Sequence, residues 1–96
     1  MITLKTLRDH RQAILDIARR YGAYDVRVFG SVARGDADAS SDVDLVVRFE
    51  PERSLFDHGG LLMDLRDLLG IEVDVVSEGA LKGRFGELVR REAVPL

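Results

Sequence analysis

The sequence predicts a single α/β domain in which helices pack on a small β-sheet. Three observations support this class. The chain has 96 residues, which is enough for one hydrophobic core and too few for two. Helix-like and strand-like segments alternate along it, in the expected order helix, strand, short helix, strand, helix, strand, helix. No internal repeat, linker or low-complexity stretch divides residues 1–96, so we expect one domain.

The first helix and the first strand are expected at the N-terminal end. Over residues 6–20 apolar side chains recur at steps of three and four, and Gly22 provides a stop signal. The residues of this stripe are Leu7, Ile14, Ile17, Ala18 and Tyr21. Residues 25–29 are rich in β-branched and aromatic side chains, which predicts a strand. Residues 31–34 follow this strand, and one helical turn is expected there.

Two further strands are predicted in the middle and late parts of the chain. Residues 35–41 are small, polar and acidic, which indicates a loop. Residues 43–49 then form the second strand, and because they are apolar on both faces the strand should be central in the sheet. Residues 71–76 form the third strand, in which acidic and valine positions alternate.

Two helices are expected around the third strand. Ser54 is followed three residues later by the acidic Asp57, which is the spacing of a helix N-cap, and leucines then recur at helical spacing up to Gly70. Gly59 and Gly60 weaken this helix by about 1 kcal/mol each relative to alanine, so the pattern allows a break there. The last helix covers residues 80–92, with an apolar stripe formed by Leu81, Phe85, Leu88 and Val89.

Composition excludes several classes of protein. The chain is 46% hydrophobic and 32% charged, and no stretch approaches the roughly 20 apolar residues of a membrane span. The N-terminal residues lack the apolar region of a secretory signal, so a cytoplasmic location without membrane contact is expected. The absence of cysteine excludes disulfides and thiolate metal sites. A net charge of −3 argues against broad nucleic-acid binding, so no direct nucleic-acid partner is expected.

Three aspartates form the candidate catalytic centre. Side chains alternate between the faces of a strand, so Asp42 and Asp44 should project from the same side. Asp74 has the corresponding place on the third strand, and the three carboxylates converge if the two strands are neighbours. Carboxylates side by side repel one another unless cations lie between them, and hard oxygen ligands suit Mg²⁺. Two such ions about 3.5–4 Å apart are a recurrent device for displacement at phosphorus.

A second group of residues is placed to hold phosphates. Gly30 and Ser31 lie where a strand passes into a helical turn, which exposes backbone N–H groups to an anion. Arg34 follows one turn later and can reach the same phosphates through its planar set of donors. The alternative for Arg34 is a surface ion pair with Asp36 or Asp38. Together with the aspartates, this pattern favours a metal-dependent nucleotide transferase that uses a nucleoside triphosphate.

Three segments carry a resemblance to a known family. They are GSVARG at residues 30–35, SDVDL at residues 41–45 and VDVV at residues 73–76. In this combination and order they resemble the minimal nucleotidyltransferase (MNT) family of the DNA polymerase β-like superfamily. The similarity spans nearly the whole chain and implies the nucleotidyltransferase fold, a small mixed sheet with helices packed on it.

The resemblance also implies roles for the candidate residues. Asp42 and Asp44 are similar to the ligands of both Mg²⁺ ions, and Asp74 to the third carboxylate, which binds one ion and orients the attacking hydroxyl. Gly30 and Ser31 would hold the triphosphate of ATP. Family members commonly act as antitoxins beside a HEPN-domain ribonuclease toxin, and some transfer AMP from ATP to tyrosines of that toxin. A HEPN toxin in a hetero-oligomer is therefore the expected partner.

Three functions remain open from the sequence. The favoured one is an antitoxin that adenylylates its toxin, because the motifs and their scaffold use almost the whole length and leave little chain for binding a small acceptor. The second is an antitoxin that acts by occlusion alone, with its aspartates inherited but unused. The third is the nucleotidyltransferase subunit of an enzyme that modifies a small molecule such as an antibiotic.

Overall fold

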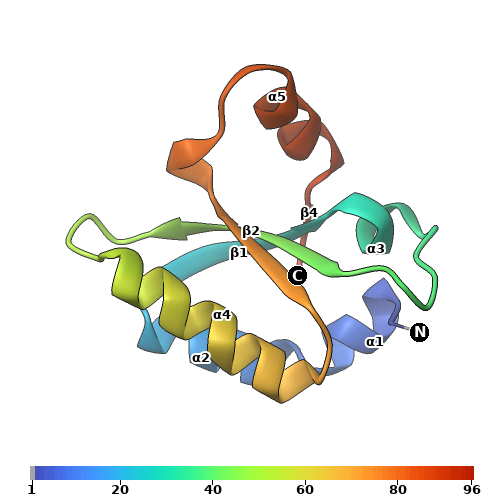
Figure 1. The fold of residues 1–96 in the computed structure, drawn as a ribbon, viewed down its shortest axis with the longest axis horizontal. Coiled ribbons are helices and arrows are strands. Elements are labelled where there is room, and N and C mark those ends of the chain that lie inside the picture. Colours follow the sequence, from blue (N-terminus) through green and yellow to red (C-terminus); the bar gives the residue numbers. More distant parts are fainter. Residues whose placement is uncertain (1) are drawn as a thin grey trace.

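The computed structural model describes residues 2–96, which form a four-stranded sheet in the order β3-β2-β1-β4 (Figure 1). The strands are β1 (Ala23–Phe29), β2 (Val43–Phe49), β3 (Val73–Ser77) and β4 (Val94–Pro95). The helices are α1 (Leu4–Asp9), α2 (Arg11–Arg20), α3 (Gly30–Arg34), α4 (Leu55–Leu69) and α5 (Gly83–Glu92), with a 3-10 turn η1 (Glu78–Ala80). β1 runs antiparallel to β2 and β4, whereas β2 and β3 are parallel. The predicted α/β class is confirmed.

Helices cover both faces of the sheet. Figure 1 shows α2 and α4 side by side on one face and α5 on the other. The larger core lies on the α2 and α4 side, where Leu45 and Val47 are fully buried against residues of α1, α2 and α4. On the α5 side, Val46 packs in a smaller cluster with Phe29, Leu81 and Val89. Because β2 contributes to both clusters, it is the central strand that its apolar sequence predicts.

The prediction of one continuous first helix is wrong. Residues 4–20 form two helices that meet at His10, whose N–H bonds to the carbonyl oxygen of Leu7 at 3.0 Å. Thr3 caps the start of α1 by accepting a hydrogen bond from the N–H of Thr6 at 3.1 Å. The apolar stripe did not reveal the turn because Leu7 and Ile14, which are both fully buried, are two helical turns apart.

The helix α4 follows its predicted signals closely. Ser54 and Asp57 form a reciprocal capping box at its start, and Gly70 ends it with a φ of 68°. The break that Gly59 and Gly60 allow does not occur. Gly60 lies against the ring of Tyr21, and a side chain there would collide with that ring. Across residues 2–96, no helix combines the length and the apolar character that crossing a bilayer requires.

The C-terminal segment differs from its prediction in two ways. Helix α5 begins at Gly83, three residues later than expected, because Glu78–Ala80 forms the separate turn η1. Strand β4 was not predicted, since two residues are too few to show periodicity. It pairs with Arg27 and Val28 of β1 and extends the sheet on the side opposite β3. This short strand returns the end of α5 toward the start of α3.

Candidate active site

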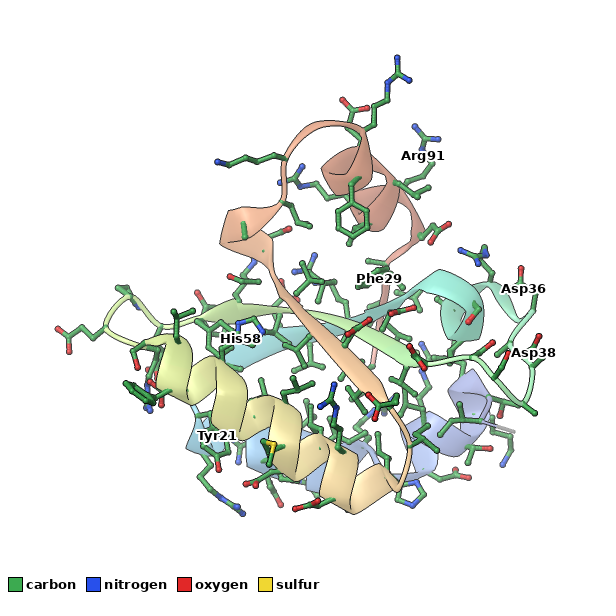
Figure 2. All side chains as sticks on the ribbon, in the orientation of Figure 1. Tyr21, Phe29, Asp36, Asp38, His58 and Arg91 are labelled. Carbon is green, nitrogen blue, oxygen red and sulfur yellow. The ribbon has the colours of Figure 1, made fainter. Side chains whose placement is uncertain are left out.

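Strand register brings two of the predicted aspartates together. Asp44 of β2 is paired with Asp74 of β3, and on its other side with Phe29 of β1. Phe29, which Figure 2 labels, belongs to the cluster on the α5 face of the sheet, where its ring lies edge-on to Phe85 of α5 at 6.3 Å between centroids. Because directly paired residues of a sheet share a face, Asp44 and Asp74 lie on this face too. Asp42 lies two residues before Asp44, at the same end of β2. The expectation that the second and third strands are neighbours is confirmed.

The electrostatics of this end of the sheet identify Asp44 as its central carboxylate. Burial raises the pKa of Asp44, and the nearby charges of Asp74 and Asp42 raise it further, while Arg34 opposes the shift. The neighbouring negative charges thus add to the resistance of Asp44 to ionisation. A divalent cation would remove that resistance.

The side chains present fit a cation in their chemistry. Asp44 is half-buried, whereas Asp42 and Asp74 are exposed and can turn toward a shared ion. All three provide the hard carboxylate oxygens that Mg²⁺ prefers. In the described part of the chain, no three acidic or histidine side chains are already arranged as a metal-binding set.

A glycine turn lies directly beside the aspartates. Gly30 ends β1 and starts α3 with a φ of 74°, in the left-handed region that favours glycine. A Cβ at this position would collide with Oδ2 of Asp44 and lie 3.2 Å from its Cγ. The absence of a side chain therefore lets the backbone of Gly30 approach the carboxylate centre. Ser31, the next residue of α3, is partly buried at the same turn.

Arg34 is held by two acidic groups. Its Nε donates to Oδ2 of Asp36 at 3.2 Å, so the ion pair expected as an alternative is present. Its Nη1 donates to both carboxylate oxygens of Glu92, at 2.9 and 3.1 Å. Asp38 instead accepts hydrogen bonds from Ser40 and Ser41 within the loop, which Figure 2 shows beside α3.

Glu92 is the site residue that sequence reasoning missed. It is the last residue of α5, and it accepts a hydrogen bond from the N–H of Gly30 at 3.2 Å. One sequence signal was available: a carboxylate at a helix C-terminus is disfavoured by the helix dipole, so it calls for a compensating contact. Its position beside Gly30 depends on β4, which periodicity did not reveal.

Comparison with known proteins connects this geometry to a family. Residues 10–94 match the family described as "Nucleotidyltransferase domain". The chain is 40% identical over 79 residues to the protein adenylyltransferase MntA of Thermococcus cleftensis, across 82% of this chain and 80% of that protein. A solved structure described as "putative minimal nucleotidyltransferase" has a TM-score of 0.87 at 54% identity, covering 99% of this chain and 97% of that one.

Solved toxin-antitoxin structures share the fold at lower identity. A toxin-antitoxin crystal structure with AMP-PNP has a TM-score of 0.75 at 20% identity. It covers 88% of this chain and 69% of that one. At this identity the likeness concerns the arrangement of helices and strands.

Proposed function

The chain belongs to the nucleotidyltransferase domain family, and from this premise we propose that it is a Mg²⁺-dependent antitoxin that adenylylates its toxin. AMP would pass from ATP to a tyrosine hydroxyl of a HEPN ribonuclease, which is thereby neutralised. The observation that carries the proposal is the pairing of Asp44 with Asp74 beside the Gly30 turn. A cytoplasmic location and a hetero-oligomer with the toxin belong to the same proposal.

Two findings support a protein as the acceptor. A relative that is 40% identical over most of its length is named a protein adenylyltransferase. In addition, Phe85 and Leu88 of α5 are 55% and 45% exposed, and α5 covers the sheet face that carries Asp44 and Asp74. Exposed apolar side chains beside a reaction centre suit contact with another protein.

The three aspartates would hold the metal ions. Asp42 and Asp44 would ligate both Mg²⁺ ions, and Asp74 would ligate one and orient the attacking hydroxyl, a proposal that the register pairing of Asp44 with Asp74 supports. When bound, the ions supply charge neutralisation at the triphosphate and at the attacking oxygen. The tyrosine hydroxyl would lose its proton to the carboxylate of Asp74 or to water as a bond forms from its oxygen to the α-phosphorus. The bond from that phosphorus to the bridging oxygen would break, and pyrophosphate would leave with the electron pair.

The turn at the start of α3 would hold the phosphates. The N–H of Gly30 and the hydroxyl of Ser31 are the proposed donors to the triphosphate, with Arg34 as a cationic contact. These groups do not react. They hold the α-phosphorus in line between the attacking hydroxyl and the leaving pyrophosphate, and such orientation is a large part of catalysis in phosphoryl transfer.

The proposal is tested by incubating the purified chain with ATP, Mg²⁺ and a HEPN protein encoded beside it. Mass spectrometry of the HEPN protein should show the addition of one or more AMP groups. The double variant Asp42→Asn with Asp44→Asn should add none. Glu52→Gln with Asp67→Asn, which removes the same charge from two exposed positions away from the site, should act like the parent.

Two outcomes would favour the other functions. If the double aspartate variant protects cells as well as the parent and no AMP adduct forms, the chain acts by occlusion. If nucleotide is transferred to a small acceptor without a HEPN protein, it is a small-molecule nucleotidyltransferase.

A further inference from the structure

We propose that Glu92 is an internal competitor for the phosphate-binding donors, which a nucleotide's triphosphate must displace in order to bind. This inference rests on the proposed function and concerns regulation of the same site. The carboxylate of Glu92 accepts hydrogen bonds from the N–H of Gly30 and from Nη1 of Arg34. Both donors belong to the group that the proposed function assigns to the triphosphate.

The fold itself places Glu92 at this position. Strands β1 and β4 pair Arg27 with Pro95 and Val28 with Val94. Gly30 directly follows β1, and Glu92 ends α5 two residues before β4, so the pairing of these strands brings the two residues near each other. Helix α5 ends at Glu92, so the residue is held by the helix on one side and by β4 on the other. The contact is therefore a consequence of sheet pairing, unlike a chance meeting of two flexible surface side chains.

The surroundings of Glu92 are otherwise unfavourable for a carboxylate. It lies at the C-terminus of α5, where the helix dipole disfavours negative charge. It is also close enough to Asp44 to raise the pKa of that group. Only 16% of its side chain is exposed, so water offsets little of this cost. The hydrogen bonds from Gly30 and Arg34 are the contacts that hold it there.

A carboxylate and a phosphate cannot both accept a full hydrogen bond from the N–H of Gly30. Gly30 has a single backbone N–H, and Glu92 already accepts from it. A phosphate oxygen in its place would also meet the negative charge of Glu92 at close range. Binding of the triphosphate therefore requires Glu92 to move. The apparent affinity is reduced by the fraction of molecules in which Glu92 occupies the donors.

The test compares nucleotide binding by the parent, Glu92→Gln and Glu87→Gln. Both variants lose one negative charge from α5, but Glu87 is exposed on the outer side of the helix. Isothermal titration with ATP and Mg²⁺, and separately with inorganic tripolyphosphate and Mg²⁺, should show Glu92→Gln binding about tenfold more tightly than the parent. Glu87→Gln should bind like the parent. Circular dichroism and thermal unfolding establish that each variant is folded.

A measurement on the parent alone gives an independent test. In a titration with ATP and Mg²⁺, the NMR signals of the Gly30 amide and of the Glu92 side-chain carboxyl carbon should shift together. Both groups change surroundings when the hydrogen bond between them breaks. A Glu92 signal that stays in place while Gly30 shifts would overturn the proposal.

The outcomes separate this inference from the proposed function. If the parent binds ATP and adenylylates its partner, but Glu92→Gln binds equally or more weakly, Glu92 is a structural contact and only the inference fails. If neither the parent nor Glu92→Gln binds ATP or tripolyphosphate, both fail.

Discussion

Gly30 and Asp44 are so close that a methyl group on Gly30 would collide with Oδ2 of the aspartate. Gly30 follows the end of β1 and Asp44 lies at the start of β2, and the antiparallel pairing of these strands brings the Gly30 turn against the three aspartates. The glycine thus connects the two halves of the candidate site. It contributes space as well as a backbone N–H.

Gly30→Ala should therefore abolish most activity. The left-handed φ of 74° costs the folded state about 1 kcal/mol once a Cβ is present. The collision additionally displaces Asp44, and a displacement of about 1 Å at a reacting centre can cost a factor of about 100 in rate. AMP transfer measured by mass spectrometry and the free energy of unfolding measured in urea would check both effects.

Gly35→Ala is the matched control for that change. Gly35 has a φ of 84°, but no atom lies within 4 Å of a Cβ placed on it. Gly35→Ala should lose about as much stability through its left-handed φ as Gly30→Ala does, while keeping most of its activity. Equal loss of activity in the two alanine variants would show that the proximity of Gly30 to Asp44 is unimportant.

Asp74→Asn should lower AMP transfer by at least about a hundredfold. If Asp74 is a metal ligand, as the proposed function requires, its replacement removes several kcal/mol of stabilisation from the transition state. Glu72→Gln is the control, because Glu72 precedes the same strand and forms an exposed ion pair with Arg66 at 3.1 Å. That variant should stay within a few tenths of a kcal/mol of the parent in stability. An Asp74→Asn protein with parental rates would remove Asp74 from the mechanism.

Asp44 should make the metal-free protein less stable as pH rises. Its pKa is raised in the folded state, mainly by burial, above the ordinary value of 3.8. The folded state then binds the proton more tightly than the unfolded state, so stability is lost as pH rises from 3.8 through the raised value. Asp44→Asn should be more stable than the parent at neutral pH without Mg²⁺, and this difference should shrink below pH 3.8. Added Mg²⁺ should stabilise the parent more than the variant.

Asp57→Asn should change stability in the opposite direction to Asp44→Asn in the same experiment. The backbone N–H of Ser54 holds the pKa of Asp57 below 3.8. Its contribution to stability is present above 3.8 and is lost as pH falls through the lowered value. Asp57→Asn should therefore be less stable than the parent at neutral pH. Urea unfolding from pH 3 to 7 would give the free energy of unfolding of the parent and of both variants. If the two substitutions changed stability with the same pH dependence, the raised pKa of Asp44 would be contradicted.

The two adjacent glycines of α4 should respond in opposite directions to alanine. At Gly59 a Cβ meets nothing within 4 Å, so Gly59→Ala should stabilise the protein by about 0.5–1 kcal/mol through helix propensity. At Gly60 a Cβ would collide with the ring of Tyr21, which also donates a hydrogen bond to Asp64 at 2.7 Å. Gly60→Ala should destabilise by about 1–3 kcal/mol. Thermal unfolding of the two variants and the parent would measure both effects. Equal stabilisation by the two substitutions would contradict the close contact between Gly60 and Tyr21.

Local patterns were sufficient for part of the fold and part of the site. The strand at residues 43–49 and the capping box at Ser54 were predicted at the positions where they occur. Both are local, because strand alternation and capping depend on residues only two or three positions apart. The split at His10 was missed for the complementary reason, since the apolar stripe is the same for one helix and for two with aligned faces.

The sequence by itself determined the chemical content of the site: aspartates at alternate positions and a glycine and serine after a strand. Tertiary structure decided which groups meet. Asp74 reaches Asp44 only because β3 pairs in parallel with β2, and Glu92 reaches Gly30 only because two residues of β4 join the edge of β1. The physical reason is that side-chain direction follows from neighbouring residues along the chain. Strand pairing, in contrast, is set by the packing of segments many residues apart.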